Sequence, residues 1–286
     1  MSNSFKSYIN QVSSIVKYYN DIQCEIDDLN IMFKGKTEDF SVLIYSNYTV
    51  LFQGKKAHDE YLKWVKEENI EEVIDHVGSD EVGCGDYFGP IVVCATLIKK
   101  EDYEFLKEIG VKDSKQLNDN EIKKIASKIK DKIKSATFIL SNEKYNQLYK
   151  TNNYNMNKIK AYLHNYVLYK IVNKNKFNGK IVVDQFCSEE LYYNYLRDYK
   201  SNDVQTNISF TTKAENKYLA VACASIIARD TFLNEIEKIS KETGYNILLG
   251  ASNEVDKLAK KILEEKGFEY LSKYVKLNFK NTEKIK

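Results

Sequence analysis

The chain has 286 residues, and its 43 basic and 41 acidic side chains nearly cancel to a formal charge of +2, which excludes a histone-like or strongly basic nucleic-acid tail. Hydrophobic residues make up 43% and charged residues 29%, which is enough apolar surface for a folded core and argues against a disordered chain. The length fits one large domain or two smaller ones.

The cysteine and histidine content limits the kinds of site and the compartment. Five scattered cysteines without a Cys-x-x-Cys pair and three histidines make a zinc site or a disulfide framework unexpected. No apolar run approaches the roughly 20 residues that span a bilayer, and the first residues, MSNSFKSYINQ, lack the apolar stretch of a signal peptide. We therefore expect a cytoplasmic protein with reduced thiols.

Residues 1–68 are expected to form a small α+β domain. Helical spacing of apolar residues predicts a helix over 4–20, followed by strands at 41–45 and 49–52 and a helix over 57–65. The hairpin carries side chains that can grip a nucleic-acid duplex, although core packing explains its aromatics equally well. These side chains are Tyr45, Tyr48, Phe52, Gln53, Lys55 and Lys56. The charge-rich stretch 66–72 contains the expected boundary, so the second domain covers 72–286.

Strands and helices alternate over that second domain. Apolar runs at 76–79, 91–98, 136–140, 181–183 and 208–210 predict strands, and the unbroken run 91–98 is typical of a strand buried on both faces. Helices are expected at 121–133, with Asn118 as its capping residue, at 157–172, and at 218–239. The last helix is rich in alanine and can therefore lie close to a sheet. The pattern predicts a mixed α/β domain.

Acidic residues stand at the ends of two predicted strands and at the start of a predicted helix. Asp80 and Glu81 end the first strand, Asp184 ends the fourth, and Glu215 precedes the alanine-rich helix. Each alone is explained equally well by a solvated turn or a helix cap. If they converge, four carboxylates would repel one another and would ionise together only beside divalent cations. Oxygen ligands suit Mg²⁺ or Mn²⁺, and two such ions support phosphodiester hydrolysis.

At these residues the sequence resembles the type 2 ribonuclease H family, most closely its ribonuclease HIII branch. The motifs that carry the resemblance occur in the family's order over roughly residues 72–286. They are GSDEVGCGDYFGPIVV (78–93), KDSKQL (112–117), NMNKIKAYLHN (155–165), VVDQF (182–186) and TKAENKYLAVACASIIAR (212–229). The N-terminal YSNYTVLFQGKKA (45–57) is similar to the family's substrate-binding domain, whose fold resembles the TATA-binding protein.

The resemblance implies an α/β fold, a ribonuclease H-like mixed sheet with flanking helices preceded by a small α+β TATA-binding-protein-like domain. It implies an endoribonuclease that hydrolyses the RNA strand of RNA/DNA hybrids with two divalent ions, Mg²⁺ or Mn²⁺, leaving 5′-phosphate and 3′-hydroxyl ends. The catalytic and metal-binding roles fall on Asp80, Glu81, Asp184 and Glu215, with Asp80 bridging both ions. Glu215 favours the HIII branch, because the HII branch tends to have Asp there; Asn278 departs from the family's expected His.

Further motif residues are expected to contact substrate. Gly83, Cys84 and Gly85 would approach a ribose 2′-hydroxyl, although a tight turn alone can require these glycines. Ser114 and Lys115 offer a hydroxyl and an ammonium for a phosphate, with a helix-capping loop as the alternative. The remaining expected contacts are Asn155, Lys158, Ser225 and Arg229.

Two alternatives stay open from the sequence. The first is ribonuclease HII-like cleavage at single ribonucleotides embedded in DNA. The second is a non-catalytic nucleic-acid-binding protein, favoured by the N-terminal hairpin and by a lysine-rich helix at 121–133 that can follow a phosphate backbone. The expected partner in the main interpretation is an RNA/DNA hybrid duplex, with no membrane association and a monomeric chain.

Overall fold

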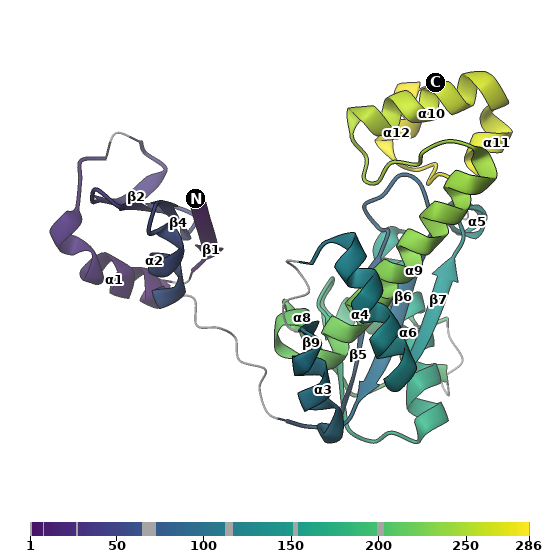
Figure 1. The fold of residues 1–286 in the computed structure, drawn as a ribbon, viewed down its shortest axis with the longest axis horizontal. Helices are drawn as coiled ribbons and strands as arrows, with labels where there is room; N and C mark the ends of the chain where they lie inside the picture. The colour runs from purple at the N-terminus through teal and green to yellow at the C-terminus, as the bar shows by residue number, and fades with distance from the viewer. Residues whose placement is uncertain are drawn as a thin grey trace. The chain divides into compact units, whose positions relative to one another are not determined.

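The computed structural model describes residues 2–7, 9–26, 28–64, 73–111, 117–150, 154–198 and 203–285. The chain divides into two compact units, Met1–Asn69 and Ile70–Lys286 (Figure 1).

The N-terminal unit is a four-stranded antiparallel sheet in the order β1-β4-β3-β2, with two helices packed on one face. Residues 2–6 form an edge strand, whereas a helix was predicted from residue 4 onward. They pair with β4, beginning with Ser2 opposite Gln53, and Phe5 packs against the core. Their side chains therefore alternate between the two faces as in a strand, instead of following a helical period. The elements are β1 (Ser2–Lys6), α1 (Ile9–Tyr18), the short 3₁₀ helix η1 (Asn20–Ile22), β2 (Ile31–Lys36), β3 (Phe40–Tyr45), β4 (Thr49–Gly54) and α2 (Ala57–Trp64).

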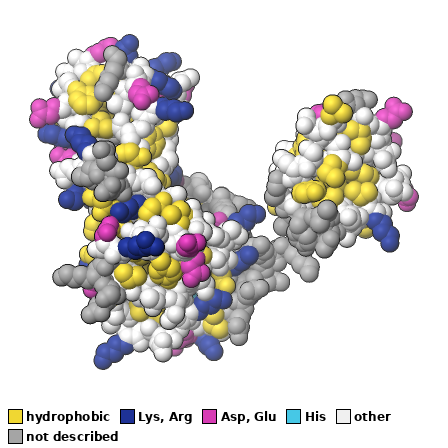
Figure 2. Space-filling model, turned by 180° about the vertical axis from the view of Figure 1, so that it is seen from behind, with side chains coloured by type: hydrophobic (Ala, Val, Ile, Leu, Met, Phe, Trp, Pro, Cys, Tyr) yellow, Lys and Arg dark blue, Asp and Glu magenta, His cyan; other side chains and the backbone are white. Residues whose placement is uncertain are grey.

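The two faces of this sheet differ in what covers them. Phe52 and Ile44 are fully buried against α1 and α2, so Phe52 belongs to the core and not to a binding surface. Because side chains alternate along a strand, Tyr45 and Gln53 lie on the opposite face, which does not contribute to the helix-covered core. Figure 2 shows hydrophobic side chains gathered on the visible surface of this unit.

The second unit contains a five-stranded mixed sheet in the order β7-β6-β5-β8-β9. The strand β5 lies in the middle, antiparallel to β6 and parallel to β8, and β9 continues the parallel side. The strands are β5 (His76–Val82), β6 (Ile91–Ile98), β7 (Lys134–Leu140), β8 (Lys180–Asp184) and β9 (Ile208–Thr211). As a result, the carboxyl ends of β5 and β8 meet at one edge, where ligand sites of such sheets form.

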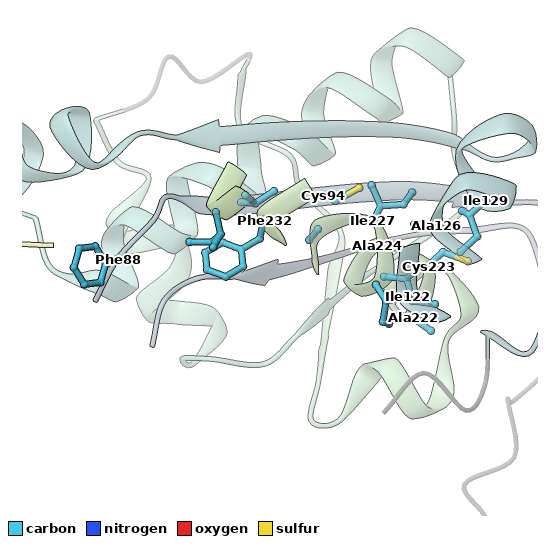
Figure 3. Close-up of a cluster of buried hydrophobic side chains, with 14 of the residues drawn as sticks. Phe88, Cys94, Ile122, Ala126, Ile129, Ala222, Cys223, Ala224, Ile227 and Phe232 are labelled. Atoms are coloured by element: carbon cyan, nitrogen blue, oxygen red, sulfur yellow. The ribbon is translucent and has the colours of Figure 1, made fainter. Parts of the chain in front are cut away.

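Helices cover both faces of the sheet, which explains the unbroken apolar run of β6. Val92 and Cys94 face the side of α4 and α9, whereas Ile91 and Val93 face α6, and all four side chains are fully buried. Figure 3 shows Cys94 among side chains of α4 and α9. The helices are η2 (Lys100–Asp102), α3 (Tyr103–Glu108), α4 (Asp119–Lys132), α5 (Asn142–Lys150), α6 (Met156–Asn175), α7 (Glu189–Tyr195), α8 (Ala214–Lys217), α9 (Leu219–Thr243), α10 (Asn253–Lys266), α11 (Phe268–Ser272) and α12 (Lys280–Ile285).

Local signals set the start of α4 and the position of α9. The Asn118 side chain accepts from the backbone N–H of Glu121, and the Glu121 carboxylate accepts from the backbone N–H of Asn118, which forms a complete capping box. Gly78 lets β5 approach α9 so closely that a Cβ there would lie 2.6 Å from the backbone nitrogen of Val221.

The three C-terminal helices α10–α12 were not predicted from the sequence. Within the described residues, no helix has the length and apolarity required to cross a membrane.

Candidate active site

Four carboxylates from three chain segments line one cleft at the carboxyl edge of the sheet. Asp80 and Glu81 come from the end of β5, Asp184 from the end of β8, and Glu215 from the one-turn helix α8 that follows β9. The cleft has a volume of about 320 Å³. The convergence that the sequence left conditional is therefore present in the fold.

Asp80 is the carboxylate that faces α9. Its side chain accepts hydrogen bonds from Ser225 and, at 2.9 Å, from the backbone N–H of Glu81. Burial is the main cause that raises the pKa of Asp80 to about 8, and the charges of Glu81 and Asp184 add to it. Ionisation of this group is therefore unfavourable unless a cation lies beside it.

Glu81 is turned toward α6, on the other face of the sheet. His164 Nε2 lies 2.8 Å from Glu81 Oε2, and the Lys160 ammonium forms an ion pair with Oε1. Burial alone would raise the pKa of Glu81, but the hydrogen bond and charge of His164, together with the charge of Lys160, outweigh it and hold the pKa at about 2. Glu81 is thus ionised at neutral pH while its neighbour in sequence resists ionisation.

Asp184 and Glu215 are linked through the start of α8. The Oδ1 atom of Asp184 accepts from the backbone N–H of Ala214 at 2.9 Å, which ties the end of β8 to the helix that presents Glu215. Among the described residues, no three His, Cys, Asp or Glu side chains are grouped so that they could hold a metal ion as they stand. The donor set still fits a hard divalent cation, because carboxylate oxygens surround a cleft in which burial penalises bare charge.

The glycine-rich turn after β5 has two different glycines. Gly83 has φ +91°, and a Cβ there would lie 2.2 Å from the carbonyl oxygen of Pro90, so no other residue fits without a backbone shift. Gly85 is exposed, and a Cβ there would meet nothing within 4 Å. Burial and the charge of Glu81 raise the pKa of the Cys84 thiol to about 12, so this cysteine is a poor nucleophile.

Residues of the C-terminal segment anchor the glycine-rich turn after β5. The side chain of Lys276 is fully buried, and its ammonium donates to the carbonyl oxygens of Asp86 at 2.8 Å and Gly89 at 2.6 Å. Phe88 also forms a β-bridge with Val275. Sequence reasoning did not find this anchor, because nothing local marks Lys276 as buried.

Ser225 and Arg229, two of the expected substrate contacts, lie one turn apart on α9, and both line the cleft. The Arg229 guanidinium contacts Asp119 Oδ1 from Nε at 3.3 Å and from Nη2 at 3.2 Å. Asp119, at the start of α4, also lines the cleft. It was not predicted as a site residue, because an acidic residue in the first turn of a helix is already explained by its favourable interaction with the helix dipole. Its partner Arg229 sits 110 residues further along the chain.

The other predicted contacts lie elsewhere or outside the described residues. Asn155 caps α6 by accepting from the backbone N–H of Lys158, and the Lys158 ammonium contacts Asp198 at 3.2 Å. Neither residue is among those that line the cleft. Ser114 and Lys115 lie outside the described residues. Two other side chains of α6, Lys160 and His164, contact the cleft carboxylate Glu81. Lys160 was not predicted as a site residue; the spacing of four residues between the two, which places them on one face of the helix, was the available signal.

Comparison with known proteins shows the family to which the chain belongs. Residues 77–282 match the family model described as Ribonuclease HII, and residues 6–73 match a domain of unknown function, DUF3378. The chain is 40% identical to a ribonuclease HIII of Phytoplasma mali, with 98% of this chain and 97% of that one covered. It is 38% identical to a ribonuclease HIII of Oceanobacillus iheyensis, with 96% and 95% covered. The crystal structure of Bst-RNase HIII in complex with Mn²⁺ superposes with a TM-score of 0.72 at 33% identity, covering 100% of this chain and 98% of that one.

The second unit is thus a ribonuclease H-like domain, and its sheet order and flanking helices confirm the predicted fold class. The chain belongs to the type 2 ribonuclease H family, in its ribonuclease HIII branch. It is accordingly an endoribonuclease of the ribonuclease H kind, a phosphodiester hydrolase.

Proposed function

We propose that the protein cleaves the RNA strand of RNA/DNA hybrids and leaves 5′-phosphate and 3′-hydroxyl ends. The observation that carries the proposal is the single cleft lined by Asp80, Glu81, Asp184 and Glu215. These side chains would hold two divalent ions, Mg²⁺ or Mn²⁺, with Asp80 shared between them. The Mn²⁺ in the complex of Bst-RNase HIII supports an ion of this type. When bound, such ions activate the attacking water and stabilise the leaving oxygen.

The protein's own residues would orient the hybrid around that centre. Ser225 fixes the Asp80 carboxylate, and Arg229, held by Asp119 at the rim, offers a cation for a phosphate of the strand being cut. The turn at Gly83 and Gly85 would bring backbone amides to the ribose, whose 2′-hydroxyl distinguishes RNA from DNA. A close approach of the ribose to the backbone at Gly85 requires open space, and nothing lies within 4 Å of a Cβ placed at this residue.

The N-terminal unit would bind the duplex through the sheet face that its helices leave uncovered. Tyr45 and Gln53 lie on this face, and each can contact a sugar or phosphate. Replacing either with Ala should raise the KM for a hybrid and leave kcat unchanged. Leu62 on α2 is 47% exposed, and Leu62→Ala is the matched control. A fall in kcat without a change in KM would contradict a binding role.

A cleavage assay tests the proposed activity directly. A long RNA/DNA hybrid and a DNA duplex with one ribonucleotide are each incubated with Mg²⁺, with Mn²⁺, or with a chelator, and the product ends are identified. We expect metal-dependent cutting of the hybrid and poor cutting at the single ribonucleotide. Efficient incision at the single ribonucleotide would instead assign ribonuclease HII-like activity. Binding of the hybrid without cutting would favour the non-catalytic alternative.

A cytoplasmic location and a monomeric state remain predictions from the sequence. All five cysteines are free in the structure.

A further inference from the structure

His164 is a buried polar side chain that joins two positions of the catalytic strand. Its ring is fully buried, with Nε2 2.8 Å from Glu81 Oε2 and Nδ1 2.8 Å from the Ser79 hydroxyl. Ser79 and Glu81 are two residues apart on β5, so both point toward α6. The imidazole therefore spans the last α6-facing positions of the strand that carries Asp80.

The contacts of the ring determine which nitrogen carries the hydrogen toward the active site. Because an ionised carboxylate only accepts hydrogen bonds, Nε2 must donate to Glu81. The Ser79 hydroxyl can donate or accept and therefore satisfies Nδ1 in either state. The ring also stacks on Phe186 at 5.4 Å with an interplanar angle of 27°. With both nitrogens bonded and one face packed, the imidazole has a single orientation.

This arrangement limits the freedom of the Glu81 carboxylate. His164 holds one oxygen and Lys160 the other, and the side chain of Glu81 is only 14% exposed. A carboxylate offers about four acceptor positions, so two contacts on the α6 side leave acceptor positions for a ligand in the cleft. A glutamate with three rotatable bonds would otherwise have to be ordered when a ligand binds.

We propose that His164 is a positioning residue for Glu81. Its imidazole sets the direction from which the Glu81 carboxylate meets a divalent cation, and it contacts neither substrate nor metal itself. The inference rests on the proposed function of the four carboxylates. It concerns a residue outside that set and assigns it a role beyond core packing.

Two substitutions separate this role from simple packing. In His164→Gln the amide nitrogen can occupy the place of Nε2 and donate to Glu81, whereas in His164→Asn the amide reaches only the place of Nδ1 and Ser79. Both variants remove the ring and its stacking on Phe186, so they serve as matched controls for each other. The readouts are Mn²⁺ binding to the full chain by calorimetry, and the Mn²⁺ dependence of hybrid cleavage.

We expect His164→Asn to weaken Mn²⁺ binding about tenfold or more, the range typical of lost outer-sphere partners, and to raise the Mn²⁺ concentration for half-maximal cleavage equally. His164→Gln should restore both values to within about threefold of the wild type. Mn²⁺ binding by His164→Asn that matches the wild type would overturn the inference. Equal losses in both variants would also overturn it, because a packing role alone predicts that result.

Asp80→Asn distinguishes a failure of this inference from a failure of the proposed function. If Asp80→Asn retains wild-type cleavage, the four-carboxylate mechanism itself is wrong. If Asp80→Asn is inactive while His164→Asn binds Mn²⁺ normally, only the role of His164 is wrong.

Discussion

Asp80 and Glu81 are adjacent in sequence but are held from opposite faces of the sheet. Asp80 accepts from Ser225 on α9, whereas Glu81 accepts from His164 on α6. Because consecutive side chains of a strand point to opposite faces, the end of β5 presents two carboxylates to one cleft from two sides. Their pKa values move in opposite directions for the same reason, since only Glu81 has basic partners.

Replacing Asp80 with Asn should reduce hybrid cleavage by more than about a hundredfold, which exceeds the usual effect of outer-sphere partners. Hybrid binding should remain, because the substitution removes a negative charge that would repel the phosphates of the hybrid. Cleavage rate and binding affinity are measured in parallel with Mg²⁺ and in chelator. Loss of binding together with activity would indicate a folding defect instead.

The same variant should be more stable than the wild type in the presence of chelator. Burial raises the pKa of Asp80 to about 8, far above its unfolded value of about 3.9. The folded state then holds more protons than the unfolded state between these pH values, so its stability falls as pH rises. The melting-temperature gain of Asp80→Asn should therefore be larger near pH 8 than near about pH 5. An equal gain at both pH values would contradict this origin.

His76 should make stability fall in mild acid. Its Nδ1 donates to the carbonyl oxygen of Ile74 at 2.9 Å, and its Nε2 accepts from the backbone N–H of Ala220 at 3.0 Å, which requires the neutral ring. Burial lowers the pKa of His76. The unfolded chain takes up a proton near pH 6.5 while the folded chain does not, so the free energy of unfolding falls below that pH.

His76→Gln can keep the acceptor toward Ala220 but cannot gain a proton in this range. Denaturation midpoints of both proteins are measured at about pH 7.5 and about pH 5.5. The wild type should lose more stability than the variant over this interval. Parallel losses would assign the acid sensitivity to other groups.

Gly78→Ala should destabilise the fold by about 1–3 kcal/mol, the usual cost of overpacking. The added methyl would lie 2.6 Å from the backbone nitrogen of Val221 and 2.9 Å from the carbonyl carbon of Ala220, so α9 would have to shift away from β5. Gly85→Ala is the control, because nothing lies within 4 Å of its Cβ, and it should change stability by less than about 0.5 kcal/mol. Denaturant titration measures both.

Lys276→Met should cost about 2 kcal/mol or more, because it leaves the carbonyl oxygens of Asp86 and Gly89 without their buried donor. It should also raise the KM for the hybrid, since the glycine-rich turn loses its anchor. Lys273, exposed three residues earlier, provides the control Lys273→Met, expected within about 0.5 kcal/mol of the wild type. An unchanged unfolding midpoint in Lys276→Met would show that the anchor contributes nothing.

Local sequence signals were sufficient to predict several of the elements. The apolar run 91–98, the capping box at Asn118 and the acids at the ends of β5 and β8 all depend on neighbours within a few residues. These signals, together with the ordered motifs, were sufficient for the fold class and for the family. They failed at residues 4–6, which were predicted to begin a helix but pair with β4 as part of a strand.

Which side chains meet at the site depends on contacts between distant segments of the chain. Glu81 and His164 are 83 residues apart, Arg229 and Asp119 are 110 apart, and Lys276 reaches a turn 187 residues before it. No periodicity within one segment carries such information, because these contacts depend on how α4, α6, α9 and the C-terminal segment pack around the sheet. The face toward which each carboxylate turns, and hence its ionisation, follows from that packing.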